Sequence, residues 1–309
     1  MTFKLSTFVK SSLVLGSVLV VSAASAEDPN VTSGRAAVYK QIPAESLEAV
    51  STRKEVMGLG APNLAPTHIW KVLEHGEKLE CLGCIPVVSK LLYDSHAKTR
   101  EISAWWLRRR IFGVFGPGQV YEQTLKTLAN PEESESHRIY AANALGEFLF
   151  QGGIGALSKA VVSDTSAAVR GAAVAGLERL NSSGKDGELS LALVDTEADV
   201  RLAALHAATR INTFTDVAGV VALIGDDSSL VRRRAAETLG VMKAADAVAG
   251  LVALASPDFE SDANVRTAAI WALGQIGDPG ARDAIEAAEN DPDASVQSAA
   301  KIAGRMLRL

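Results

Sequence analysis

One motif recurs seven times between residues 94 and 304, at spacings of 31 to 38 residues, and this internal repeat limits the possible folds more than any other feature. An arginine, replaced by glutamine in the last copy, marks each copy, and a small residue follows three positions later. Positions three, four and seven apart share one face of an α-helix, so each copy predicts a helix with one apolar face. Units of this length form solenoids, in which each unit packs on its neighbours. The marked positions are Arg100, Arg138, Arg170, Arg201, Arg232, Arg266 and Gln297.

An acidic residue precedes the marker by six positions in every copy. An acid just before a helix accepts hydrogen bonds from the free N–H groups of its first turn and favours the positive end of the helix dipole. We expect each arginine to bridge to the acid of its own or the next repeat. Because every repeat must pack in the same way, an acid that recurs in every copy indicates a structural role rather than a catalytic one. Its members are Asp94, Glu132, Asp164, Asp195, Asp226, Glu260 and Asp291.

A second apolar segment precedes each acid, so each unit is expected to be a pair of short helices that cannot bury their apolar faces alone. The predicted fold class is therefore all-α, an α-solenoid or superhelix of about seven helix pairs. A composition that is 48% hydrophobic but only 5% aromatic agrees with tightly packed helices rather than a β-sandwich. Examples of the first segments are residues 85–93, 120–128, 189–194, 217–224 and 248–254.

The pattern D-x-x-x-x-V-R-x-x-A and the Leu-Gly pairs at Leu145-Gly146, Leu239-Gly240 and Leu273-Gly274 resemble the HEAT repeats of the bilin-lyase-like subclass. The resemblance covers about residues 85–309. It implies a solenoid of HEAT-like helix pairs, and solenoids of this type mostly present surfaces to partners. A protein partner in the same compartment is the expectation that follows.

Residues 1–26 have the three parts of a secretory signal peptide: Lys4 and Lys10, an apolar run over 13–21, and Ala24-Ser25-Ala26 before the expected cut. The apolar run is shorter than a membrane span of about 20 residues, so no membrane span is predicted. Loss of two lysines changes the formal charge from −5 to −7. An acidic chain lacks the basic excess that nucleic-acid binding requires, so no nucleic-acid partner is expected. We predict a periplasmic or secreted protein cut after Ala26.

Four segments are expected: a signal peptide over 1–26, an extended N-terminal arm over 27–66, an atypical N-terminal cap with the first repeat over 67–119, and HEAT-like repeats over 120–309. The arm contains one plausible helix, over 44–55. Aromatic residues are concentrated between residues 70 and 150. This end of the chain either seals the solenoid as a bulky cap or forms an aromatic and arginine-rich docking patch.

The position five residues after the marker should point away from the core, on the second helix of each pair. Its residues are mixed and include two tryptophans, whereas a solvated ridge would be mostly charged. The alternative is that tight helix packing buries these tryptophans. With two neighbours from the aromatic segment, the predicted partner-binding residues are Trp105, Trp106, Arg109, Asn143, His206 and Trp271.

Cys81 and Cys84 are the only cysteines, and in an exported protein they predict one disulfide that closes a very small loop. Alternatives are a redox dithiol, or a metal site with His68, His75 and His96, although their spacing matches no common zinc template. The chain lacks the repeated His-Glu dipeptides of deoxyhypusine hydroxylase-like proteins, and no cofactor or metal is predicted.

The sequence therefore predicts an exported scaffold that binds a partner protein through its concave face and its aromatic N-terminal cap. A metal- or thiol-dependent role centred on Cys81, Cys84 and the nearby histidines is the alternative. No catalytic residue is predicted, because the chain has no nucleophile elbow, metalloprotease motif or phosphate loop.

Overall fold

The computed structural model describes residues 50–113 and 116–307, and there the chain is an α-solenoid of paired helices, as predicted. The first helices of the seven pairs are α5 (Ile85–Lys90), α7 (Gln119–Ala129), α9 (Ile154–Ser163), α11 (Glu188–Ala192), α13 (Val217–Ala222), α15 (Val248–Leu254) and α17 (Arg282–Ala288). The second helices are α6 (Ala97–Arg108), α8 (Glu135–Glu147), α10 (Ala167–Arg179), α12 (Ala198–Ala208), α14 (Ser229–Val241), α16 (Ala263–Ile276) and α18 (Ala294–Met306).

Short 3-10 turns adjoin many of the first helices. They are η1 (Leu82–Cys84), η2 (Leu91–Tyr93), η3 (Gln151–Gly153), η4 (Leu223–Gly225), η5 (Ala245–Ala247) and η6 (Pro279–Ala281).

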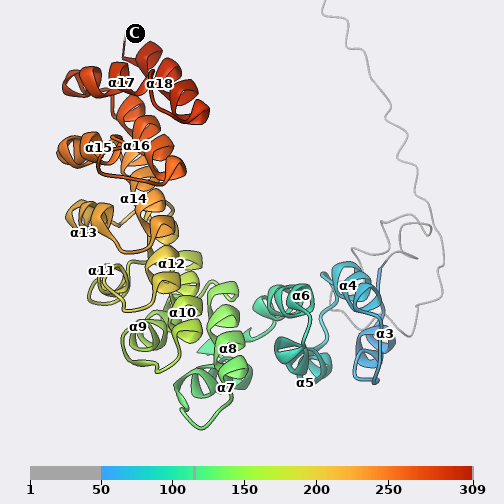
Figure 1. Cartoon of the computed structure of the whole chain (residues 1–309). Helices are drawn as coiled ribbons and strands as arrows, with labels where there is room; N and C mark the ends of the chain where they lie inside the picture. Colours follow the sequence, from blue (N-terminus) through green and yellow to red (C-terminus); the bar gives the residue numbers. More distant parts are fainter. Residues whose placement is uncertain (1–49, 114–115, 308–309) are drawn as a thin grey trace, which may run out of the picture.

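The pairs follow one another along a curve, and each type of helix keeps to one side of it (Figure 1). The second helices, α6 to α18, line the inner side, and the first helices, α5 to α17, lie on the outer side. The predicted signal peptide lies outside the described residues. Within the described ranges, no helix has the length and apolar character needed to cross a bilayer.

The core is built from the apolar positions of the repeated motif. In α10, Val169, Ala173 and Leu177 are completely buried, and the equivalent valine, alanine and leucine are buried in α14 and α16. The glycine after the leucine lets neighbouring second helices approach closely. A Cβ on Gly146 would lie 2.9 Å from the Cα of Gly176 on the next helix. The Leu-Gly pair is therefore a packing requirement of this solenoid.

An additional helix pair precedes the first repeat. Helix α3 (Arg53–Gly58) begins with a capping box between Thr52 and Glu55, and α4 (Pro66–His75) packs on α6 as the second helices pack on one another. The arm expected over 27–66 thus contains a folded helix in its described part. The first half of the helix expected over 44–55 lies outside the described residues, and α3 begins within its second half.

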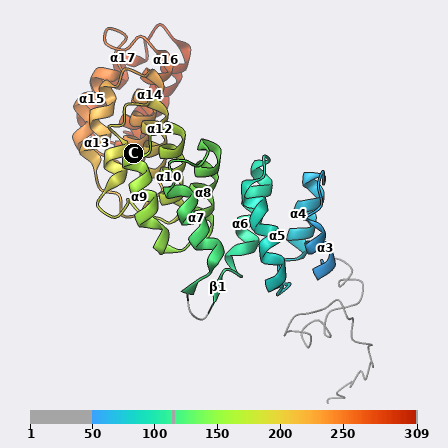
Figure 2. The same cartoon turned by 90° about the horizontal axis from the view of Figure 1, so that it is seen from below.

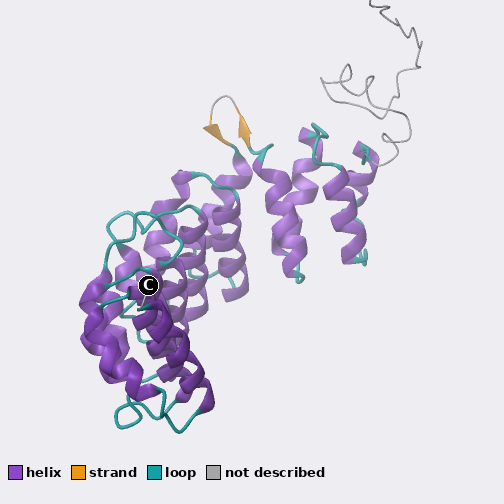
Figure 3. Ribbon diagram, turned by 90° about the horizontal axis from the view of Figure 1, so that it is seen from above, coloured by secondary structure: helices purple, strands orange, loops and turns teal. Residues whose placement is uncertain are grey.

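The long connection between α6 and α7 forms a two-stranded hairpin, seen at the junction in Figures 2 and 3. Strands β1 (Phe112–Gly113) and β2 (Gly116–Pro117) pair antiparallel. Next to it, the Phe112 ring lies 5.6 Å from that of Tyr121 and 4.9 Å from that of Phe150. Part of the aromatic content between residues 70 and 150 is therefore packed at this junction, where Tyr121 and Phe148 are buried, Phe112 is half-buried and Phe150 is exposed.

Candidate functional site on the inner face

A ladder of ion pairs connects consecutive repeats. Each arginine of the motif presents its Nε–Nη2 edge to both carboxylate oxygens of the acid in the next repeat, and the Nε–O distances are 2.6–3.0 Å. This two-point geometry is the strongest form of the arginine–carboxylate contact. The expected bridge to the next repeat is confirmed for five pairs: Arg138–Asp164, Arg170–Asp195, Arg201–Asp226, Arg232–Glu260 and Arg266–Asp291.

Each arginine also ties its own repeat together through the third nitrogen. Nη1 of Arg170 donates to the backbone carbonyl of Asp164, and Nη1 of Arg201 does the same to Asp195. Burial raises the pKa of the Asp195 carboxyl, but hydrogen bonds from Arg170 and from the Glu197 backbone lower it more, so that its pKa lies below the usual value. The carboxylates of the ladder are charged structural groups.

The ladder is interrupted between the first and second repeats. Asn130 ends α7 and accepts the backbone N–H of Glu132, as Asp164 ends α9 and accepts the N–H of Ser166. Asn130 therefore occupies the acid position of the second repeat, and the assignment of Glu132 to that column is wrong. The loop between α7 and α8 has two residues more than the loop between α9 and α10. Glu132 therefore precedes Arg138 by six positions, although Asn130 is the residue at the end of the first helix.

Arg100 is the arginine left without its ladder partner. Its Nη1 keeps the usual contacts with its own repeat, to the carbonyls of Asp94 at 2.7 Å and Ser95 at 2.9 Å. Its guanidinium carbon lies 3.8 Å from the ring centroid of Tyr140, a cation–π contact. Within 50–113 and 116–307, no carboxylate pairs with Arg100.

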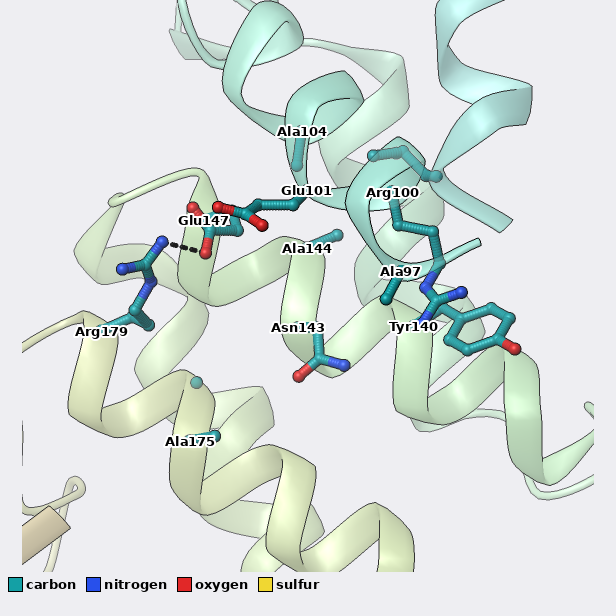
Figure 4. A pocket seen from close by; sticks show the side chains of 12 residues that line it. Ala97, Arg100, Glu101, Ala104, Tyr140, Asn143, Ala144, Glu147, Ala175 and Arg179 are labelled. Carbon is teal, nitrogen blue, oxygen red and sulfur yellow. Dashed lines mark hydrogen bonds and ion pairs between the residues drawn. The ribbon is translucent and has the colours of Figure 1, made fainter. Parts of the chain in front are cut away.

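A cavity of about 280 Å³ opens at this junction, between α6, α8 and α10 (Figure 4). Arg100 and Tyr140 line one end of it, and Glu101 and Glu147 lie at the other, where Glu147 pairs with Arg179. Asn143 lines the same cavity from α8. The site combines an aromatic ring, an amide and charges of both signs on the inner side of the curve.

The outer side of the same junction is open as well. A groove of about 540 Å³ runs between α5 and α7, and many of its lining side chains are apolar, among them Ile85, Pro86 and Val120. Leu82, in the small loop of the disulfide, is 77% exposed at its edge.

Four of the predicted partner-binding residues lie at separate places along the inner face. Trp105 is half-buried and packs against the core, whereas Asn143 is exposed in the junction cavity. His206 is exposed, with its Nδ1 2.9 Å from Oε2 of Glu178. Trp271 lines a different cavity, of about 390 Å³, between α14 and α16. The structure does not gather these residues into one patch.

Trp106 does not belong to any binding surface. Its side chain is completely buried, its Nε1 donates to the carbonyl of Gly76 at 2.9 Å, and the Arg110 guanidinium lies 3.6 Å above its ring. The prediction that Trp106 contacts a partner is therefore wrong, because no part of the ring is accessible. Arg109 is exposed and forms an ion pair with Glu77 at 2.8 Å.

Cys81 and Cys84 form a disulfide with an S–S distance of 2.04 Å, and both residues are buried. His68, His75 and His96 are exposed. Across the described ranges, no group of three or more histidine, cysteine, aspartate or glutamate side chains has a metal-binding arrangement.

Sequence reasoning missed Arg100 and Tyr140 as site residues. The available signal was the spacing of 38 residues between Arg100 and Arg138, the longest between two markers. A longer connection at one junction shifts the acid position relative to the marker.

Comparisons with known proteins agree with this architecture. Residues 217–303 match the family described as HEAT repeats. The solved structure of the Escherichia coli protein YibA is similar over 89% of this chain and 97% of that chain, with 17% identity and a TM-score of 0.55. Kap95p, in a complex with RanGDP, is similar over 82% of this chain and 38% of its own, with 13% identity and a TM-score of 0.57.

A more distant likeness is the CpcE–CpcF complex of phycocyanin lyase from Nostoc sp. PCC7120, at 21% identity over 80% of this chain and 88% of that chain, with a TM-score of 0.39. No curated protein sequence matches the chain. At these identities the comparisons show the fold alone, a solenoid built from helix pairs.

Proposed function

We propose that this chain, a HEAT-repeat protein, is an exported scaffold that binds a partner protein along the inner face of its solenoid. The observation that carries the proposal is the junction cavity, where the ladder of ion pairs is interrupted and Arg100, Tyr140 and Asn143 face the inner side. A pocket with an aromatic ring and an arginine is the kind of place where interface energy concentrates.

The rest of the inner face supports the same use. Five positions after each marker, the second helices expose residues that are mostly uncharged, including Asn143, Ala175 and Ile302. A surface maintained only for solubility would carry charged residues there. Kap95p, which shares this fold, is known from a complex with a protein, RanGDP. A curved row of helices offers a long surface to a partner.

Export is supported by the sequence of residues 1–26 and agrees with the disulfide, since disulfides persist in oxidising compartments. We expect the mature protein to begin at Glu27 and to be recovered from the periplasm or the medium. N-terminal sequencing of the protein from each cell fraction tests this. Recovery of the uncut chain from the cytoplasm would contradict the proposed export.

Binding along the inner face is tested by site-specific photocrosslinking in the cells that make the protein. A photoreactive residue at Ala175, exposed on α10, should yield a crosslink to one partner. The same residue at Leu191 on the outer helix α11, which is 53% exposed, is the matched control and should yield none.

Loss of the Ala175 crosslink in the Trp105→Ala/Trp271→Ala variant, with unchanged helical circular dichroism, would support a role for the tryptophans. Equal crosslinking from Ala175 and Leu191 would refute an inner-face site.

A further inference from the structure

One arginine of the ladder, Arg100, has no carboxylate of the described residues at the edge of its guanidinium that binds a carboxylate in the other repeats. In five repeats, Nε and Nη2 hold both oxygens of an acid. Arg100 has the same position on its helix and the same Nη1 contacts to Asp94 and Ser95. Among the described residues, its Nε and Nη2 have no hydrogen-bond partner.

Two acids of the neighbouring segment have other contacts. Glu133 contacts His137 at 3.3 Å, and Glu135 accepts the hydroxyl of Ser166 at 2.7 Å. Glu101 extends to the far end of the cavity, toward Glu147 (Figure 4). The residue in the ladder position is Asn130, which carries no charge.

Arg100 also lies beside a cavity that an external group can enter. Arg100 lines the cavity of about 280 Å³ on the inner face and is half-buried there. The Tyr140 ring, 3.8 Å from the guanidinium carbon, supports one face of the guanidinium plane. A fixed and partly desolvated guanidinium is a stronger and more selective donor to a carboxylate than an exposed one.

We propose that Arg100 binds the carboxylate of an aspartate or glutamate side chain of the partner protein, which takes the position that Asn130 leaves uncharged. This inference rests on the proposed function for the identity of the partner. The opposite end of the cavity favours a protein side chain over a phosphate group, because Glu101 and Glu147 would repel a doubly charged anion. A singly charged carboxylate meets about half of that repulsion.

The binding test uses the arginine Nε–H signals of the whole mature protein in nuclear magnetic resonance. The Arg100 signal is identified by its absence in Arg100→Lys. The probes are N-acetyl-aspartate amide and, as the uncharged match, N-acetyl-asparagine amide. We expect a saturable shift of Arg100 with the aspartate probe, with a dissociation constant at least about tenfold lower than for the asparagine probe. Exposed Arg282 should not respond.

Asn130→Asp is the decisive variant, because it supplies the missing carboxylate from within the chain. The Arg100 signal should then move without any probe, and the response to the aspartate probe should fall at least about tenfold. Asn130→Ser keeps an oxygen for the Glu132 N–H but adds no charge, so it should respond as the wild type does. A response of Arg100 equal to that of Arg282, or an unchanged response in Asn130→Asp, would overturn the carboxylate site.

Crosslinking separates this inference from the proposed function. If the Ala175 crosslink survives in Asn130→Asp while the aspartate probe no longer binds, the partner does not use Arg100, and the inference is wrong although the scaffold stands. If the probe binds but no partner crosslinks from the inner face, the scaffold proposal fails and the carboxylate site remains. Loss of the crosslink and of probe binding in Asn130→Asp, with the crosslink and probe binding retained in Asn130→Ser, supports the inference.

Discussion

Asp291 accepts two hydrogen bonds from the guanidinium of Arg266, with Oδ2 2.8 Å from Nε and Oδ1 2.9 Å from Nη2, and the two side chains are only 0% and 5% exposed. Arg266 belongs to α16, and Asp291 begins the connection to α18, so the contact ties the last two repeats. A pair so shielded from water depends on both partners being present.

Asp291→Ala should lower the free energy of unfolding by about 3–5 kcal/mol, because it leaves the Arg266 charge buried without its counterion. The matched control is Glu77→Ala, which breaks the exposed pair with Arg109 and should cost at most about 1 kcal/mol. Urea denaturation followed by helical circular dichroism measures both. Equal losses of unfolding free energy in the two variants would show that burial does not determine how much an ion pair stabilises the fold.

The stability of the solenoid should decrease in acid. The hydrogen bond from Arg266 lowers the pKa of Asp291 against the opposing effect of burial. Burial raises the pKa values of Asp226 and Glu260, but contacts with their arginines and hydrogen bonds from the backbone together lower them more. A carboxyl group whose pKa is lower in the folded state stabilises the fold above its unfolded pKa, and this contribution is lost as the pH falls through the folded value.

The urea midpoint should therefore be nearly constant down to about pH 5 and fall steeply below about pH 4. Asp291→Asn should show a shallower fall than the wild type, because it has one titrating group fewer. An unchanged midpoint between pH 5 and pH 3 would contradict this prediction.

Tyr121→Phe should leave stability unchanged or raise it by up to about 1 kcal/mol. The Tyr121 hydroxyl is buried and has no hydrogen-bond partner among the described residues, and burial raises its pKa to about 12. Phenylalanine keeps the ring packed against Phe148 and removes the unsatisfied polar atom. Tyr93→Phe is the control, since the Tyr93 hydroxyl lies 3.4 Å from Oγ1 of Thr127 and loses that contact. Thermal unfolding of both variants measures which of them is the more stable. A larger loss of stability in Tyr121→Phe than in Tyr93→Phe would contradict the prediction.

Two glycines of α10 should respond in opposite ways to alanine. A Cβ on Gly176 would lie 2.8 Å from Leu157 and 3.0 Å from the carbonyl of Ala142, so Gly176→Ala should destabilise the protein by about 1–3 kcal/mol. A Cβ on Gly171 would have no neighbour within 4 Å, and Gly171→Ala should stabilise α10 by about 0.5–1 kcal/mol. Urea midpoints of the two variants test the prediction, and a change of the same sign in both would contradict it.

The repeat made most of the fold predictable. A valine before the arginine, alanine three positions after it and leucine seven positions after it recur because each helix must fill the same space against its neighbour, so the register follows from the pattern. A bridge from each arginine to the acid of its own or the next repeat was predicted for the same reason. Five junctions of the solenoid repeat that geometry.

The candidate site was not predictable in this way, because it lies where the repeat fails. Glu132 stands at the expected distance from Arg138, and only the end of α7 at Asn130 reveals that the acid position has moved. Trp106 was misplaced for a related reason. Its equivalents in other repeats, such as Ala144 and Ala207, are small and buried. These equivalents indicated an interior position, but a side chain as large as tryptophan suggested a surface contact instead.

The interrupted ladder also determines how the molecule would respond to force. In the described part of the chain, five consecutive junctions have a two-point ionic fastening, and the junction between α6 and α8 has none. Under tension applied along the solenoid, separation should begin at that junction, so that the segment from α3 to α6 swings away while the repeats from α7 onward stay together. The ion pairs thus divide the chain into a stiff C-terminal part and an N-terminal part that can move against it.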